Sequence, residues 1–119
     1  MWCHGIRGAT IVAENTAEAI LTSSRELLHQ IVAANGVKTD NIAFILFTTT
    51  PDLNAAFPAA AAREMGWSQI ALLCSHEMNV PGSPRRCLRI LMAVNTDKKP
   101  DQIVHVYQKG AEVLRPDLG

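Results

Sequence analysis

A proline-rich turn between two apolar runs is the feature that most constrains the fold of this chain. Residues 80–84 read Val-Pro-Gly-Ser-Pro; one apolar run ends before them near Cys74, and another follows them and reaches Asn95. Proline has no amide hydrogen to donate to a strand ladder, and Pro-Gly combinations favour turns. We therefore expect the chain to reverse direction here, with strands at 69–74 and 86–95 before and after the turn.

Arg89 interrupts the second of these apolar runs. Side chains of a strand alternate between two faces, so Leu88 and Ile90 point one way and Arg89 points the other. A full charge on a largely apolar face needs a partner, water or a ligand. Arg89 is therefore a candidate functional residue rather than an ordinary surface charge.

Arg7 lies in a similar position within a first strand, expected at residues 2–12. It shares a face with Gly5 and Ala9, whose small size leaves room for a guanidinium group and for something bound to it. The alternative is that Gly5 and Gly8 only permit a bulge or close strand packing. The sequence leaves both interpretations open.

Two helices are predicted between the strands. Apolar residues recur at helical spacing from Ile20 to Val32; Asn15 is expected to cap this helix, with Glu18 completing a capping-box pattern, and Gly36 to end it. A short helix is expected at residues 57–66, with a proline in its first turn and a glycine beyond its end.

The compact apolar run 42–49 predicts a buried strand, and residues 103–107 predict another short strand or helical turn. The predicted fold is α+β: a mixed sheet of about five strands with one long helix and short helical turns, in one domain of residues 1–119 whose tail from about 115 is loosely held. One helix covers only one face of such a sheet. We therefore expect another copy of the chain to cover the other face.

Composition excludes several partners. Eleven basic and eleven acidic residues give a net charge of zero, so neither a nucleic-acid surface nor a membrane surface is indicated. No apolar run approaches the ~20 residues that span a bilayer, and the N-terminus does not resemble a signal peptide. Three cysteines without a recognisable framework favour a reducing compartment. We expect a cytoplasmic protein.

The residue types also argue against several kinds of catalytic centre. Cys3-His4 and Cys74-x-His76 supply metal-ligand types, but without the paired spacing of zinc sites, so we expect no metal. No glycine-rich phosphate loop and no convincing nucleophile is present. Seven of the eleven basic residues are arginine, whose planar fork suits carboxylates and phosphates. This pattern suits a reaction that needs no covalent catalysis.

Several separated motifs resemble those of the AroH-class chorismate mutases, which are small monofunctional enzymes of bacteria. They cover nearly the whole chain, and in order they are Gly5-Ile-Arg-Gly-Ala-Thr, Thr50-Pro-Asp-Leu-x-x-x-Phe-Pro-Ala-x-x-x-Arg, Glu77-Met-x-Val-x-Gly, Cys87-x-Arg89, His105-Val-Tyr and Leu114-Arg-Pro-Asp-Leu. The resemblance implies a homotrimer with a pseudo-α/β-barrel core and active sites at subunit interfaces. It also implies the Claisen rearrangement of chorismate to prephenate, without a cofactor, on the route to phenylalanine and tyrosine.

The resemblance also implies roles for individual residues. Arg89 would donate to the ether oxygen of chorismate, Arg7 would assist there and bind a carboxylate, and Tyr107 would donate to a carboxylate. Glu77 and Cys74 would contact the ring hydroxyl. The remaining substrate-binding residues, which would add positive charge or form the apolar wall, are Phe57, Ala59, Arg63, Leu72, Leu73, Leu114 and Arg115.

Alternatives remain at three of these positions and for the function. Tyr107 could be an amphipathic core residue, Glu77 a solvated turn residue and Cys74 a small core hydrophobe. Strict strand alternation also puts Cys74 and Glu77 on opposite faces. The competing functions are a trimeric imine deaminase of the YjgF type, in which an interfacial arginine binds a small carboxylate, and a ligand-binding module without turnover.

Overall fold

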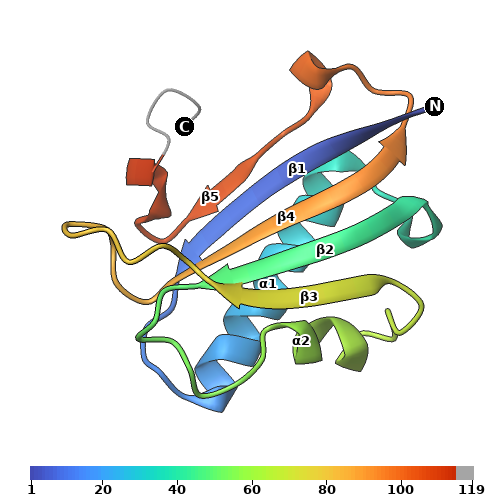
Figure 1. Cartoon of the computed structure of the whole chain (residues 1–119). Helices are drawn as coiled ribbons and strands as arrows, with labels where there is room; N and C mark the ends of the chain where they lie inside the picture. Colours follow the sequence, from blue (N-terminus) through green and yellow to red (C-terminus); the bar gives the residue numbers. More distant parts are fainter. Residues whose placement is uncertain (115–119) are drawn as a thin grey trace.

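Five strands form one mixed sheet in a computed structural model that describes residues 1–114. The strand order is β3-β2-β4-β1-β5 (Figure 1). β4 is antiparallel to both of its neighbours, whereas β3 and β5 pair in parallel with β2 and β1 at the two edges. The strands are β1 (Trp2–Ile11), β2 (Ile42–Thr49), β3 (Ala71–His76), β4 (Cys87–Thr96) and β5 (Val106–Gln108). The predicted mixed five-stranded sheet is confirmed.

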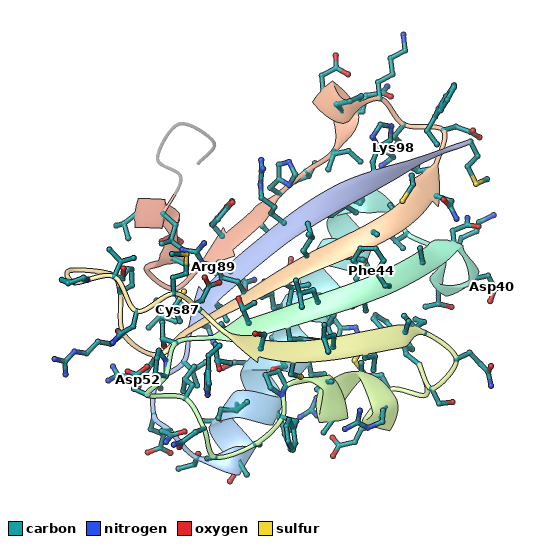
Figure 2. The ribbon with its side chains drawn as sticks, viewed as in Figure 1. Asp40, Phe44, Asp52, Cys87, Arg89 and Lys98 are labelled. Carbon is teal, nitrogen blue, oxygen red and sulfur yellow. The ribbon has the colours of Figure 1, made fainter. Side chains whose placement is uncertain are left out.

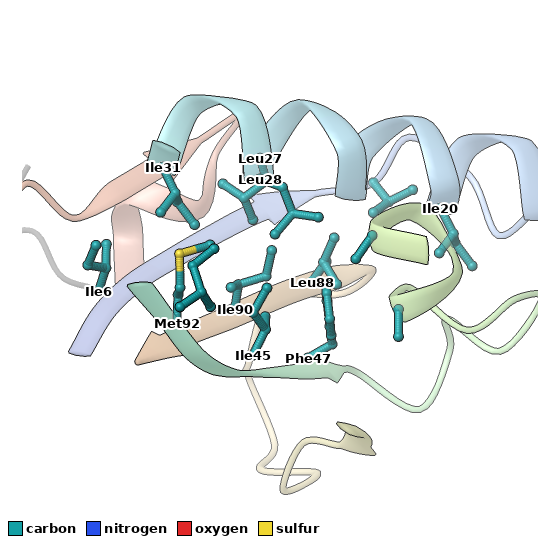
Figure 3. Packing of buried hydrophobic residues seen from close by; sticks show 14 of the residues in the cluster. Ile6, Ile20, Leu27, Leu28, Ile31, Ile45, Phe47, Leu88, Ile90 and Met92 are labelled. Atoms are coloured by element: carbon teal, nitrogen blue, oxygen red, sulfur yellow. The ribbon is translucent and has the colours of Figure 1, made fainter. Parts of the chain in front are cut away.

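The long helix α1 (Ala17–Asn35) crosses one face of the sheet, and the short helix α2 (Ala59–Glu64) packs beside it (Figure 1). Alternation in β4 turns Leu88, Ile90 and Met92 toward α1, where all three are buried. Figure 3 shows them packed beneath Leu27, Leu28 and Ile31 of the helix. The apolar stripe of α1 and the even-numbered positions of β4 thus form the two halves of one core.

Gly8 allows α1 to approach β1 closely. A Cβ atom at Gly8 would lie 2.6 Å from Cδ1 of Ile31, which is fully buried. A Cβ at Gly5, on the other face, would lie 3.2 Å from Cδ1 of Leu91. Of the two interpretations of these glycines, close packing therefore applies to Gly8.

The predicted end of α1 is confirmed, but its predicted cap is wrong. Gly36 ends the helix in the left-handed conformation, with φ at 59°, and its N–H donates to the carbonyl of Val32. At the other end, Thr16 rather than Asn15 accepts the amide of Ala19. The Asn15 side chain instead accepts the amides of two residues of the loop that precedes α2, Asn54 and Ala55, each at 3.0 Å.

Other boundaries differ from the prediction by one or two residues. The third strand spans Ala71–His76 rather than 69–74, because Gln69 and Ile70 belong to the turn that leads into it. β4 begins one residue late, since Arg86 adopts a left-handed conformation that a strand cannot contain. Pro58 precedes α2 as its N-cap residue.

The second face of the sheet is apolar, and no element among residues 1–114 covers it. Leu46 pairs with Leu73 on one side and Leu91 on the other, which places a row of leucines across three strands. Leu73 is 65% exposed, Phe44 44% and Leu91 39%. Figure 2 shows Phe44 and Arg89 on this face, with α1 behind the sheet. We call it the open face.

Candidate active site

Four strands, the loop after β3 and the 3₁₀ helix Ala111–Leu114 bring the principal candidate residues to one pocket at an end of the open face. The pocket has a volume of about 290 Å³. Its apolar wall comes from Leu46 of β2 and Leu91 of β4, whose side chains lie on the open face. The predicted site residues that line it are Arg7, Glu77, Arg89, Tyr107 and Leu114.

Strand register explains why Arg89 and Tyr107 face the same space. Ala9 of β1 pairs with Arg89 on one side and with Tyr107 on the other. Neighbouring strands lie ~4.8 Å apart, so the backbones of Arg89 and Tyr107 are separated by roughly 10 Å across a methyl group. That width fits a small ring compound lying over Ala9, with a hydrogen-bond donor on each side.

Glu77 and Thr48 hold Arg89 on its outer side. Nε of Arg89 lies 3.5 Å from Oε2 of Glu77, and the hydroxyl of Thr48 donates to the same carboxylate oxygen. Thr48 also pairs with Arg89 in the sheet register. The Glu77 side chain is only 24% exposed, and its amide donates to the carbonyl of Thr49 at 2.8 Å. Glu77 is therefore anchored at the pocket and is not a freely solvated turn residue.

His105 links β5 to β1 beside the pocket. Its Nδ1 accepts the backbone amide of Arg7 at 2.9 Å, just before the parallel pairing of Gly8 with Val106 begins. This hydrogen bond fixes the register that places Tyr107 beside Arg7. The Nδ1 atom must be unprotonated to accept it.

The pocket is electropositive, and a buried thiol that does not line it lies next to Arg89. Two guanidinium groups, from Arg7 and Arg89, meet one carboxylate, from Glu77. Cys87 is on the same face two residues before Arg89 and is 2% exposed. Burial raises the pKa of the Cys87 thiol, and hydrogen bonding to Arg89 opposes that rise. This thiol therefore stays protonated at neutral pH.

A second pocket, of about 380 Å³, contains two further predicted residues, Phe57 and Cys74. It lies between the loop that leads into α2 and the end of β3, and Phe57 is 71% exposed there. Cys74 and Glu77 thus line different pockets of one chain, as strand alternation suggests. A single chain does not bring these two side chains to one ligand.

The other predicted substrate-binding residues also lie away from the Arg89 pocket within one chain. Arg63 is exposed on α2, and Leu73 is exposed on the open face. Leu72 packs partly buried against the core, and Ala59, only 4% exposed, belongs to that core. Arg115 lies outside the described residues.

The sequence prediction missed Thr48 and His105. Thr48 follows Leu46 on the open face. The change from an apolar to a polar residue along that face could have identified Thr48 as a candidate site residue. His105 begins one of the motifs that resemble the family, but the sequence indicated no role for it, because its bond to Arg7 depends on the pairing of segments 98 residues apart. Among residues 1–114, no group of three His, Cys, Asp or Glu side chains could hold a metal ion. No helix of this part of the chain is long and apolar enough to cross a bilayer.

Comparison with known proteins shows which family this chain resembles along its length. The family described as chorismate mutase type I matches residues 3–118. The chorismate mutase AroH of Bacillus subtilis (strain 168) is 45% identical over 119 residues, covering 99% of this chain and 94% of that protein. The chorismate mutase AroH of Thermus thermophilus is 48% identical over 116 residues, covering 97% and 95%.

A solved structure is similar along nearly the whole chain. The chorismate mutase from Clostridium thermocellum superimposes with a TM-score of 0.91 at 50% sequence identity, covering 95% of this chain and 99% of that one. The strand order and helix placement described above are therefore those of a known chorismate mutase fold. On the sequence match and the fold together, this chain belongs to the chorismate mutase type I family.

Proposed function

We propose that this chain rearranges chorismate to prephenate in the Arg89 pocket, without a cofactor, as a step in the synthesis of phenylalanine and tyrosine. The observation that carries the proposal is the meeting of two arginines and a tyrosine in one small, largely apolar pocket. Chorismate carries two carboxylates on a compact ring, and arginine forks suit carboxylates. Family membership favours this reaction over imine deamination.

The chemistry requires positioning and electrostatics rather than a nucleophile. In this rearrangement the ether C–O bond of chorismate breaks while a new C–C bond forms within the same molecule, and negative charge grows on the ether oxygen. Holding the compact reactive conformer lowers the barrier by up to ~7–11 kcal/mol. One well-placed donor at the oxygen contributes about 2.7–4 kcal/mol more.

The pocket residues divide these tasks. Because Glu77 engages Nε of Arg89, the terminal nitrogens of that guanidinium are left for the ether oxygen. Arg7 and Tyr107, on neighbouring strands, bind carboxylate oxygens. The second oxygen of the Glu77 carboxylate accepts the ring hydroxyl. Leu46, Leu91 and Leu114 pack against the ring.

The proposed assembly is a homotrimer in which each site lies between two subunits. Two observations support it: the open face is apolar and uncovered by residues 1–114, and the predicted site residues of one chain fall into separate groups. A neighbouring subunit would supply the second group, Phe57, Ala59, Arg63, Leu72, Leu73 and Cys74. Arg115, which lies outside the described residues, would add positive charge. We infer a cytoplasmic location, because the three cysteines are all unpaired.

The test is chorismate consumption, followed by ultraviolet absorbance, with prephenate identified by its conversion in acid to phenylpyruvate. Arg89→Ala is compared with Arg85→Ala, which removes an exposed arginine of the neighbouring turn. We expect saturable turnover that falls at least ~100-fold in Arg89→Ala and stays unchanged in Arg85→Ala. Absence of turnover by folded wild-type protein would overturn the proposal. Light scattering after gel filtration tests the trimer separately.

A further inference from the structure

A hydrogen-bonded network joins the ends of β1 and β2 to the start of β4. It consists of Thr50, Asp52, Arg86 and Cys87, and we call it the Asp52 network. It lies at the same end of the sheet as Arg89 (Figure 2). None of its four side chains lines the Arg89 pocket.

Arg86 has the most unusual backbone in this network. Its φ is 49°, in the left-handed region that L-residues other than glycine and asparagine seldom adopt. Such a conformation persists only where surrounding contacts hold it, and it often occurs near functional sites. The residue comes three positions before Arg89, so its conformation sets the direction in which β4 begins.

Asp52 supplies the contacts that hold Arg86. Both oxygens of its carboxylate accept the backbone amide of Arg86, at 3.0 and 3.2 Å. The Thr50 hydroxyl donates to the same carboxylate. Donation from Thr50 and from Arg86 holds the pKa of Asp52 below its ordinary value, so the carboxylate is charged throughout the neutral range.

Thr50 carries the connection onward to β4. Its hydroxyl oxygen accepts the amide of Cys87 at 3.0 Å, and its own amide donates to the carbonyl of Cys87 at the same distance. Arg86 connects the start of β4 to Val12, the residue that follows β1. Its Nε donates to the carbonyl of Val12 at 2.9 Å, and its carbonyl accepts the amide of Val12. Cys87, the first residue of β4, and Arg86 before it are therefore both fixed to neighbouring chain segments.

The two ends of the turn at residues 77–86 thus attach to consecutive residues of the same chain segment. Glu77 bonds to Thr49, and Cys87 bonds to Thr50. This arrangement holds the segment that carries Glu77 at a fixed separation from the segment that carries Arg89. The 3.5 Å contact between Arg89 and Glu77 depends on that separation.

We propose that Asp52 is a positioning residue for Arg89, acting through Thr50 and through the backbone of Arg86 and Cys87. This inference rests on the proposed function, since it assigns Asp52 to the same rearrangement. Without the carboxylate, Arg86 relaxes toward an ordinary backbone conformation and the start of β4 turns. The guanidinium of Arg89 then moves relative to Glu77 and to the ether oxygen. A displacement of ~1 Å at a reacting group costs up to about 100-fold in rate.

The experiment compares three pairs of variants. Asp52→Ala is paired with Asp40→Ala, which removes another exposed aspartate. Thr50→Val, which loses the hydroxyl, is paired with Thr50→Ser, which keeps it. Asp52→Ala is also combined with Arg86→Gly, because glycine adopts the left-handed conformation without support. For each variant we would measure kcat, KM, the thermal midpoint and the hydrogen exchange of the Cys87 and Arg89 amides.

The expected result is a fall of about 10- to 100-fold in kcat, with little change in KM, for Asp52→Ala and Thr50→Val. Asp40→Ala and Thr50→Ser keep wild-type kcat, and Arg86→Gly recovers most of the activity that Asp52→Ala loses. Asp52→Asn, which keeps an acceptor for the Arg86 amide, retains intermediate activity and serves if Asp52→Ala fails to fold.

A lower thermal midpoint with unchanged kcat would make the network purely structural and overturn the inference. If Arg86→Gly recovers none of the activity that Asp52→Ala loses, Asp52 does not position Arg89 through the backbone of Arg86. The exchange measurement separates this inference from the proposed function. If wild-type protein does not convert chorismate, the proposed function fails, but the positioning role of Asp52 can still be tested. Faster hydrogen exchange of the Cys87 and Arg89 amides in Asp52→Ala would support that role, and unchanged exchange would overturn it.

Discussion

Arg89 and Glu77 form an ion pair at 3.5 Å whose carboxylate oxygen also accepts the Thr48 hydroxyl. The arginine side chain is 45% exposed and the glutamate 24%. Ion pairs with this much exposure contribute little to stability, with a median of about 0–1 kcal/mol. The pair is therefore better understood as orienting a guanidinium group than as holding the fold together.

Replacing Glu77 tests this interpretation, and the chain offers a matched control. Glu64 also pairs with an arginine at 3.5 Å, but on the opposite side of the molecule, through Arg25 of α1. We expect Glu77→Ala to reduce kcat/KM at least ~10-fold, because Arg89 loses its orienting partner. Both Glu77→Ala and Glu64→Ala should change the free energy of unfolding by less than about 1 kcal/mol. Equal and small kinetic effects would show that Glu77 has no part in turnover.

A mixing experiment tests whether each site is built from two subunits. Arg89→Ala disables the first group of site residues, and Arg63→Ala weakens the second. If neighbouring subunits supply the two groups, unfolding and refolding an equal mixture gives trimers in which about a quarter of the sites carry both arginines. The mixture should then be more active than the average of the two variants refolded alone. Activity equal to the average of the two variants would mean that each site forms within one subunit.

Thr10 offers a gain in stability. Its side chain is 1% exposed, and its hydroxyl has no hydrogen-bond partner among the described residues. Thr10→Val keeps the shape and removes the cost of burying that hydroxyl, so we expect stabilisation of about 1 kcal/mol with unchanged turnover. Denaturant unfolding at one fixed protein concentration measures it. A loss of stability would mean that the hydroxyl is satisfied in the assembled protein.

The stability contributed by Asp52 should disappear in acid. Donation from Thr50 and Arg86 lowers the pKa of Asp52 in the folded chain from 3.8, its value in the unfolded chain. The contribution is therefore fully present above the unfolded pKa and is lost as pH falls through the lower, folded pKa. Wild-type protein and Asp52→Asn, compared by denaturant unfolding, should differ in stability at pH 6. The difference should narrow as pH falls below 3.8; a difference independent of pH would exclude this linkage.

The features predicted correctly from sequence are those that neighbouring residues determine. Gly36 ended α1 as expected because a left-handed residue is needed at that point whatever surrounds it. The direction of Arg89 followed from alternation alone. Chain reversal after Glu77 followed from proline and glycine chemistry.

The features predicted wrongly depend on contacts between distant segments. Asn15 and Thr16 are both good helix caps. Asn15 does not cap α1 because its side chain already accepts the amides of Asn54 and Ala55. The role of His105 depends on the parallel pairing of β5 with β1. No local pattern near residue 105 reports that pairing. The separation of Cys74 from Glu77 was suggested by alternation, but the two pockets in which they lie became visible only in the folded chain.

Gly8 belongs to two environments at once. Its backbone forms part of the floor of the Arg89 pocket, while Cδ1 of Ile31 occupies the opposite side, 2.6 Å from where a Cβ would be. At that point a single backbone layer separates the pocket from the hydrophobic core. The position of the pocket floor therefore depends on the side-chain volumes of α1. Searches for variants with altered turnover should include Leu27 and Ile31, which do not line the pocket, because enlarging or shrinking them moves its floor.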